Sequence, residues 1–303
     1  MDAWILATVA AAFLQNLRFL LQKRLAGTHL STAGATFARF VWGAPLAVAL
    51  VAALLAVRDT ALPGMDARFW LAALAGGVAQ IMGTVFVVAL FGRRNFAVGI
   101  TLKKTETFQT ALVGFVVLGE AVPPAALGAI AVGFAGVVLL SDPPTPAPGQ
   151  GWARRLLNPS AGLGLGAGAM FGISATGYRA AGLALEGGDA LLRAAVTLAA
   201  VTTAQALVMG AWLAWRERGE IRRVFRHWRI TGLVGLTSVA GSLGWFTAFT
   251  LQTAAYVQAV GQVELVFTLL TSWLVFREKS TRRELTGIAL VVASILALVL
   301  LVG

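Results

Sequence analysis

The sequence predicts an all-α integral membrane protein, with ten transmembrane helices arranged as two inverted five-helix repeats around a central cavity. The first observation is composition: 58% of the 303 residues are hydrophobic and only 12% are charged, whereas about 25% of residues are charged in soluble domains. The second is a succession of apolar segments, each near the roughly 20 residues that a helix needs to cross the hydrocarbon layer. The third is a faint repetition of the sequence after 158 positions.

The repetition is defined by its constant offset, since no single match is unusual in a chain rich in Gly and Phe. Five apolar segments in each copy are an odd number, so the second copy enters the bilayer from the opposite side. Secondary transporters use such inverted repeats to alternate between two openings. The matching pairs include Phe13 and Phe171, Trp70 and Trp228, Gly77 and Gly235, Gly83 and Gly241, Phe91 and Phe249, Glu106 and Glu264, Val117 and Val275, and Glu120 and Glu278.

Hydropathy places the ten spans in two groups of five, separated by a Pro/Gly-rich linker. We expect a first repeat at residues 1–141, the linker at 142–159 (DPPTPAPGQGWARRLLNP) and a second repeat at 160–303, together forming one membrane domain. The predicted spans are 3–22, 33–57, 69–91, 96–118 and 124–141, then 160–181, 189–214, 230–251, 254–276 and 284–302.

The distribution of basic residues predicts the orientation. Sixteen Lys and Arg fall in the loops after the first, third, fifth, seventh and ninth spans, against Arg58 and Arg68 on the other side. The positive-inside rule therefore places these five loops in the cytoplasm and both termini outside. The basic and aromatic segment 215–229 (WRERGEIRRVFRHWR) is expected to lie along the cytoplasmic headgroups. Binding of a regulator by the same segment remains an alternative.

The composition argues against other classes of protein. The chain has no Cys and two His, His29 and His227, so neither a cysteine nucleophile nor a histidine-rich metal site is expected. We expect no catalytic residues, no metal and no cofactor; an integral-membrane enzyme is the disfavoured alternative of another class. The net charge of +11 is attributed to cytoplasmic loops facing anionic lipids, not to nucleic acid. The expected partners are a small-molecule substrate and membrane lipids. The oligomeric state is left open, and a monomer is one of the alternatives.

Charged side chains within the spans are costly in lipid, so they are expected to face a cavity or an opposite charge. Lys103 and Glu106 share a helical face at i, i+3 spacing and can neutralise one another. Glu106 and its repeat mate Glu264 are candidates for a proton or charge relay. Structural ion pairing of these glutamates, with Arg39 and Arg193 as further partners, is the interpretation that we favour, because a glutamate held by a basic partner stays ionised.

Uncharged polar residues in the spans suggest a site for a zwitterionic solute. A cation would hold the carboxylate, amide oxygens would accept from the ammonium group, and an aromatic wall would contact the side chain. Hydrogen bonding between helices is the alternative for any single Gln or Thr. The candidate substrate-binding residues are Gln15, Arg18, Gln80, Thr84, Lys104, Tyr178, Trp245, Gln258 and Gln262.

The end of the first repeat resembles a known family. The segment AVGITLKKTETFQTALVGFVVLGEAVPPAALGAIAVGFAGVVLL has a short Ala-rich hairpin, a polar fourth span, a Leu-Gly-Glu end and a Gly-rich fifth span. It is similar to the EamA-type module of the drug/metabolite transporter superfamily. The second copy departs from this pattern, because Arg277-Glu278 replaces Gly-Glu, while Gly287 keeps the glycine of the last span after a one-residue shift.

Within that superfamily the chain looks most like the aromatic amino acid exporters of bacterial inner membranes. The resemblance implies ten helices, a cavity lined by spans 1, 3, 4, 6, 8 and 9, and efflux of small metabolites. The expected function is export of amino acids, aromatic and other neutral ones, or of similar metabolites across the inner membrane by alternating access. Export of other small organic solutes, such as cationic drugs, is the alternative.

Overall fold

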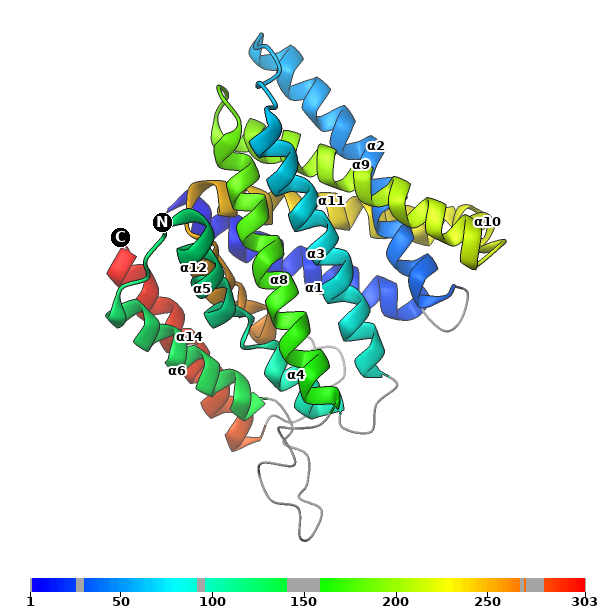
Figure 1. The fold of residues 1–303 in the computed structure, drawn as a ribbon. Coiled ribbons are helices and arrows are strands. Elements are labelled where there is room, and N and C mark those ends of the chain that lie inside the picture. Colours follow the sequence, from blue (N-terminus) through cyan, green and yellow to red (C-terminus); the bar gives the residue numbers. More distant parts are fainter. Residues whose placement is uncertain are drawn as a thin grey trace. The chain divides into compact units, whose positions relative to one another are not determined.

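A computed structural model describes residues 2–25, 30–91, 96–140, 159–267, 270 and 281–302. The described residues form helices, together with an isolated bridge between Gly64 and Glu186. The helices, labelled in Figure 1, are α1 (Ala3–Leu25), α2 (Thr32–Arg58), α3 (Ala67–Phe91), α4 (Phe96–Lys103), α5 (Glu106–Leu118), α6 (Pro124–Leu140), α8 (Pro159–Ala184), α9 (Ala190–Arg216), α10 (Glu220–Arg226), α11 (Trp228–Leu251), α12 (Ala254–Gly261) and α14 (Arg282–Val302).

The described residues of the predicted spans lie mostly on helices, but two of the spans are not continuous helices. The span expected at 96–118 is divided between α4 and α5, and the span expected at 254–276 ends as α12 at Gly261. Helical residues resume at 263–267, and most of 268–276 lies outside the described residues, as does nearly all of the predicted linker. Five described helices are long and apolar enough to cross a membrane: α2, α3, α9, α11 and α14.

The 158-position offset of the sequence recurs in the helix boundaries. Helix α2 spans 32–58 and α9 spans 190–216, so both boundaries are displaced by 158. The same displacement relates α4 at 96–103 to α12 at 254–261. For these two pairs of helices the boundaries repeat at the same offset, even though few of the residues themselves are identical.

The chain divides into two compact units, and both draw on both halves of the sequence. The first contains Ala3–Val78 and Gly177–Gln252; the second contains the described residues of Ala79–Thr176 and Thr253–Gly303. Helix α3 passes from one unit to the other between Val78 and Ala79, and α8 does so between Thr176 and Gly177. The predicted repeats at 1–141 and 160–303 stay a prediction.

In the first unit, α1 packs on α11, and α2 packs on α9 and α11. Glycine permits the close approach of α11 to α1: a Cβ added at Gly244 would lie 2.8 Å from the carbonyl oxygen of Ala7. Such small residues bring helices together in lipid, where the hydrophobic effect offers little driving force. Near one end of α2 and α9, Leu25, Phe37, Leu213 and Val234 form a buried apolar cluster.

In the second unit, α6 and α14 lie side by side, as Figure 1 shows, and α5 packs on α12. A Cβ at Gly136 would lie 2.6 Å from the carbonyl oxygen of Gly287. The hydroxyl of Ser294 donates to the carbonyl oxygen of Ala129 at 2.6 Å. Small residues and an interhelical hydrogen bond thus hold α6 against α14.

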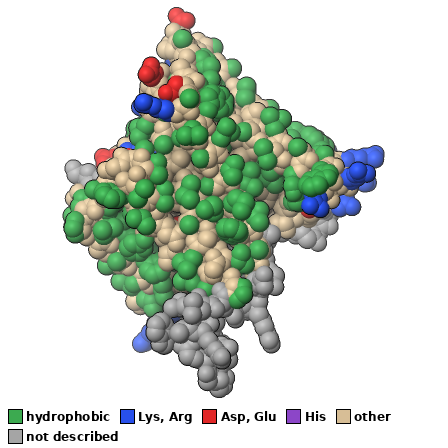
Figure 2. All heavy atoms as spheres, in the orientation of Figure 1, with side chains coloured by type: hydrophobic (Ala, Val, Ile, Leu, Met, Phe, Trp, Pro, Cys, Tyr) green, Lys and Arg blue, Asp and Glu red, His purple; other side chains and the backbone are tan. Residues whose placement is uncertain are grey.

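Large apolar side chains cover much of the surface, as the space-filling view in Figure 2 shows. They project from long helices at positions such as Leu46, Leu71, Val116, Leu207 and Leu300. A water-soluble protein rarely exposes contiguous apolar surface on this scale. The exposed apolar side chains and the long apolar helices together indicate a multi-pass membrane protein.

Candidate functional site

The interruption between α4 and α5 is a tight turn inside what the sequence predicted to be one helix. The backbone N–H of Lys104 donates to the carbonyl oxygen of Thr101 and that of Thr105 to Leu102, both at 3.1 Å. These are i→i−3 bonds, which close narrower rings than α-helical bonds and often mark functional hinges when they occur within a helix. The continuous span predicted at 96–118 is wrong at this point.

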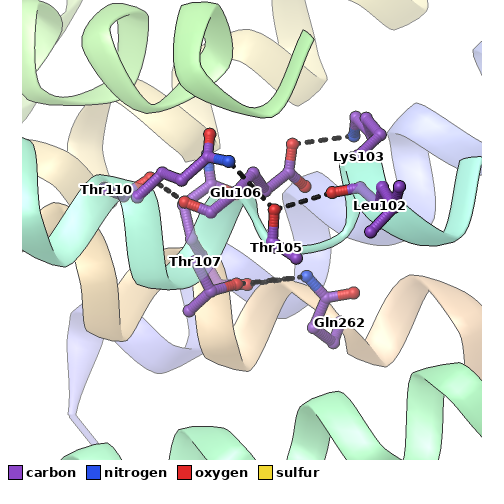
Figure 3. Close-up of polar contacts among 9 residues, drawn as sticks. Leu102, Lys103, Thr105, Glu106, Thr107, Thr110 and Gln262 are labelled. Atoms are coloured by element: carbon purple, nitrogen blue, oxygen red, sulfur yellow. Dashed lines mark hydrogen bonds and ion pairs between the residues drawn. The ribbon is translucent and has the colours of Figure 1, made fainter. Parts of the chain in front are cut away.

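Side chains explain why this turn forms without a proline. The hydroxyl of Thr105 donates to the carbonyl oxygen of Leu102 at 2.7 Å, and the amide of Gln109 donates to the hydroxyl of Thr105 at 3.0 Å. A threonine hydroxyl that competes for backbone carbonyls favours a turn over a regular helix. Figure 3 shows Thr105 between its carbonyl partner on α4 and the first turn of α5.

The second interruption, at Gln262, has the same character. The N–H of Gln262 donates to the carbonyl oxygen of Ala259 at 3.2 Å, so the i−4 carbonyl, that of Gln258, loses its usual partner. The side-chain amide of Gln262 donates to this carbonyl at 3.4 Å instead. Lys104 and Gln262 are 158 positions apart, so the two interruptions fall at equivalent places in the sequence repetition.

An ion pair lies beside the first interruption. The Nζ of Lys103 lies 2.8 Å from a carboxylate oxygen of Glu106 (Figure 3), the contact that their i, i+3 spacing predicts. Glu106 is 5% exposed. Lys103 also lies over the ring of Phe171 on α8, 4.9 Å from its centroid, where the negative face of the ring attracts the ammonium group. The pair is thus packed on an aromatic surface as well as neutralised.

Gln262 connects the two interruptions. Its side chain is 8% exposed, and its Nε2 lies 3.5 Å from the hydroxyl of Thr107 in the first turn of α5 (Figure 3). Its Oε1 is buried and has no hydrogen-bond partner among the described residues. An unsatisfied buried acceptor costs about 1–3 kcal/mol, so this oxygen is suited to receive a donor from a bound solute or water.

The charges around the interruptions balance. Lys104 is half-buried and interacts electrostatically with Lys103, Glu264 and Glu106. The cluster thus contains two ammonium groups and two carboxylates. Such a cluster attracts neither a simple anion nor a simple cation strongly, but it offers both signs of charge to a zwitterion.

The Gly-rich face of α8 allows close packing against this region. A Cβ added at Gly168 would lie 2.9 Å from Oε1 of Gln109 and 3.0 Å from the carbonyl oxygen of Lys103. One added at Gly172 would lie 3.1 Å from the backbone nitrogen of Thr110. The glycines therefore leave space that the turn and α5 occupy.

Two further predicted binding residues, Gln80 and Thr84, belong to the same unit on the second part of α3. The hydroxyl of Thr84 donates to the carbonyl oxygen of Gln80 at 2.8 Å. Both side chains are half-buried. Between them, Gly83 lies close to Phe171, the ring that also contacts Lys103.

The first unit holds the predicted aromatic residues. Tyr178 is buried and stacks on Phe246, with ring centroids 4.3 Å apart. Trp245 is half-buried and stacks on Phe249 at 5.9 Å, and its indole nitrogen is buried without a hydrogen-bond partner among the described residues. Their stacking provides an aromatic surface on α8 and α11.

The same unit contains the predicted residues Gln15 and Arg18 of α1. Arg18 is buried and Gln15 is half-buried.

Arg39 donates from Nε to the hydroxyl of Ser238 at 2.8 Å and from Nη2 to that of Ser242 at 3.4 Å. The cost of placing this charge in α2 is therefore offset by hydroxyl acceptors on α11.

The two half-buried arginines of α8 and α9 differ in their partners. Arg193 is half-buried near the start of α9, and its Nε has no hydrogen-bond partner within the described part of the chain. Arg179 donates to the carbonyl oxygens of Phe249 at 2.8 Å and Gln252 at 2.7 Å. Because a cation at a helix C-terminus is favourable, Arg179 stabilises the end of α11.

The predicted site residues are thus divided between the two units. The interruptions bring six of them together: Lys103, Lys104, Glu106, Gln258, Gln262 and Glu264. Convergence of all candidates on one cavity, and pairing of the glutamates with Arg39 or Arg193, stay predictions. Sequence reasoning missed Thr105, Thr107 and Phe171. The only sequence signal for the threonines was the polar segment ITLKKTETFQT. No pattern in the sequence near Phe171 indicated its contact with Lys103.

Comparisons with known proteins agree with this architecture. Residues 159–300 match the EamA-like transporter family. No curated protein matches the chain. A solved structure titled "Crystal structure of protein" superposes with a TM-score of 0.73 over 98% of this chain and 96% of its own, at 15% sequence identity. At that identity the likeness establishes a shared fold alone.

The long apolar helices indicate a multi-pass membrane protein, and residues 159–300 are similar to the EamA-like transporter family.

Proposed function

We propose that this protein is a secondary transporter that exports neutral amino acids, aromatic ones among them, or similar small metabolites across a bacterial inner membrane. The observation that carries the proposal is the pair of helix interruptions at Lys104–Thr105 and Gln262, joined through Thr107 and surrounded by balanced charges. Transporters commonly bind their substrates where helices are discontinuous. The repeated helix boundaries support an inverted repeat, the arrangement that gives such a carrier two equivalent openings.

Charge balance favours a zwitterionic substrate over a cationic one. In this proposal Lys104 holds the substrate carboxylate, and Oε1 of Gln262 accepts from the ammonium group. A site for cationic drugs would need a carboxylate available to the drug, whereas Glu106 is already paired with Lys103.

Alternating access would use the interruptions as hinges. A turn with i→i−3 bonds can return to α-helical bonding by exchanging single hydrogen bonds, so its two forms are close in free energy. The substrate must bind both forms with similar affinity, or it would not be released. The excess of arginine in the loops on one side places the termini outside the cytoplasm in this proposal.

Counterflow into proteoliposomes tests the proposal. Vesicles containing the purified protein and a high concentration of one unlabelled amino acid should take up labelled amino acid, and several neutral amino acids should compete. Gln262→Leu and Trp245→Ala should each reduce the initial rate at least tenfold. Gln205→Leu is the matched control, since Gln205 is also a buried glutamine but donates to the carbonyl oxygen of Gly77 in the other unit.

Three results would count against the proposal. If the protein moves no compound in a broad panel of metabolites, the assignment as a transporter fails. If it moves organic cations and no amino acids, the substrate class is wrong. Equal losses in Gln262→Leu and Gln205→Leu would place the binding site elsewhere.

A further inference from the structure

The segment that joins α9 to α11 has an unusual division of charge. It contains six arginines and two glutamates between residues 216 and 229, and it includes the short helix α10. The two acids face the protein interior and the arginines face outward. The segment therefore presents a positive surface, even though its sequence contains both signs of charge.

Both glutamates accept hydrogen bonds from Ser31, directly before the start of α2. Glu220 is 3% exposed, and its Oε1 accepts from the backbone nitrogen of Ser31 at 2.5 Å. Glu217 accepts from the hydroxyl of Ser31, also at 2.5 Å. Because α2 begins at Thr32, these carboxylates lie at the positive end of its dipole, where negative charge is favourable.

The arginines remain available to partners outside the protein. Figure 2 shows a group of basic side chains where Figure 1 labels α10. Arg223 donates to Glu220 at 3.0 Å, yet its side chain is still largely exposed. The exposed arginines of the segment are Arg216, Arg218, Arg222, Arg223, Arg226 and Arg229.

Exposed aromatic rings alternate with the arginines. Trp215 is 67% exposed and Trp228 is 58% exposed. The guanidinium of Arg216 lies 4.1 Å from the ring centroid of Trp215, and that of Arg229 lies 5.8 Å from Trp228. Tryptophan prefers the boundary between headgroups and acyl chains, so these rings are suited to the depth of lipid carbonyls.

The connectivity fixes the depth of the segment. Both α9 and α11 are long and apolar enough to cross the membrane, and α10 lies between the end of one and the start of the other. The arginines must therefore lie where these two helices leave the hydrocarbon, at the level of lipid phosphates. We propose that this face, Arg216–Arg229, is a binding site selective for anionic phospholipids.

Charge complementarity selects this occupant. Guanidinium groups bind phosphate oxygens bidentately, and the tryptophans contact the glycerol and acyl regions of the same lipid. A soluble acidic protein could match the charge but would leave Trp215 and Trp228 without an apolar partner. Each arginine near an anionic surface contributes an effect of about fivefold in binding.

Native mass spectrometry of the full-length protein in detergent tests the site. The protein would be offered equal amounts of phosphatidylglycerol and phosphatidylcholine, and the ratio of retained lipids measured. The intact protein should retain phosphatidylglycerol preferentially. The variant Arg222→Gln/Arg226→Gln should lower this preference at least fivefold, since both arginines are exposed on α10.

The control is Arg282→Gln/Arg283→Gln, which removes two exposed charges at the start of α14 and should leave most of the preference intact. If the α10 double variant fails to fold, Arg222→Gln carries the test, with about a fivefold loss expected. The proposal is overturned if the intact protein shows no preference, if the control loses as much as the α10 variant, or if poly-glutamate displaces phosphatidylglycerol at equal concentration.

Discussion

Removing one member of the Lys103–Glu106 ion pair should destabilise the protein more than removing both. The two groups are 2.8 Å apart, and their side chains are 20% and 7% exposed. Removing one partner of a buried pair leaves an uncompensated charge and costs about 3–5 kcal/mol, whereas replacing both is often nearly neutral. We expect about 3 kcal/mol for Glu106→Gln and for Lys103→Met, because Lys103 is not fully buried.

The measurement is a double-mutant cycle on the free energy of unfolding, using Lys103→Met, Glu106→Gln and the combination. The double variant should be less destabilised than the sum of the singles by at least 2 kcal/mol, well beyond the 0.3–0.5 kcal/mol within which independent sites add. Arg58 and Asp189 provide the matched control, because their pair is closer, at 2.5 Å, but exposed, and should couple by less than about 1 kcal/mol.

Additive single effects at Lys103 and Glu106 would refute the reasoning. The same variants also separate the two roles considered for Glu106. If it is structural, the double variant should still transport and an imposed pH gradient should have little effect on either protein. A strong response of the intact protein to the gradient, lost in Glu106→Gln, would establish the relay instead.

Three other predictions concern packing, pH and capping. Gly168→Leu should destabilise the protein by about 1–3 kcal/mol in chemical unfolding, because the added carbons meet α5 and the turn, while Gly162→Leu, at an open position, should cost less. The N–H of Leu192 and then Arg58 lower the pKa of Asp189. The stabilisation by its carboxylate should therefore be complete above about pH 4 and disappear as the pH falls through the lowered value, which comparison with Asp189→Asn in thermal unfolding would reveal. Glu220→Gln should cost about 1–3 kcal/mol by weakening the bond to Ser31.

Each of these three has a contrary outcome. Equal costs at Gly168 and Gly162 would mean that the close approach of α8 is not required. A difference between the intact protein and Asp189→Asn that persists unchanged to pH 2 would exclude the carboxylate as its source. An unchanged unfolding free energy in Glu220→Gln would show that water can replace the cap at α2.

The positions of long helices could be predicted from sequence, because apolar length alone determines them. The span expected at 33–57 is α2 at Thr32–Arg58, and the span expected at 230–251 is α11 at Trp228–Leu251. Hydropathy did not reveal the interruptions, because it is averaged over spans of about 20 residues that stay apolar overall around these polar positions. They depend on the carbonyl bonds of Thr105 and Gln262, which regular helix geometry does not anticipate.

The candidate site was predictable in composition and only partly in geometry. The i, i+3 spacing correctly predicted the contact between Lys103 and Glu106, although Lys103 ends α4 and Glu106 begins α5. Contacts such as Lys103 with Phe171, or Glu220 with Ser31, join residues far apart in sequence and leave no local pattern.

The way in which α3 and α8 contribute to both compact units has a consequence for biosynthesis. The first unit needs Gln252 as well as Ala3, and the second needs residues after Thr253 as well as Ala79–Thr176. Neither unit can be completed until most of the polypeptide has left the ribosome. The helices that are made early must therefore be stable in the bilayer by themselves. A chain that stops before α11 would lack parts of both units.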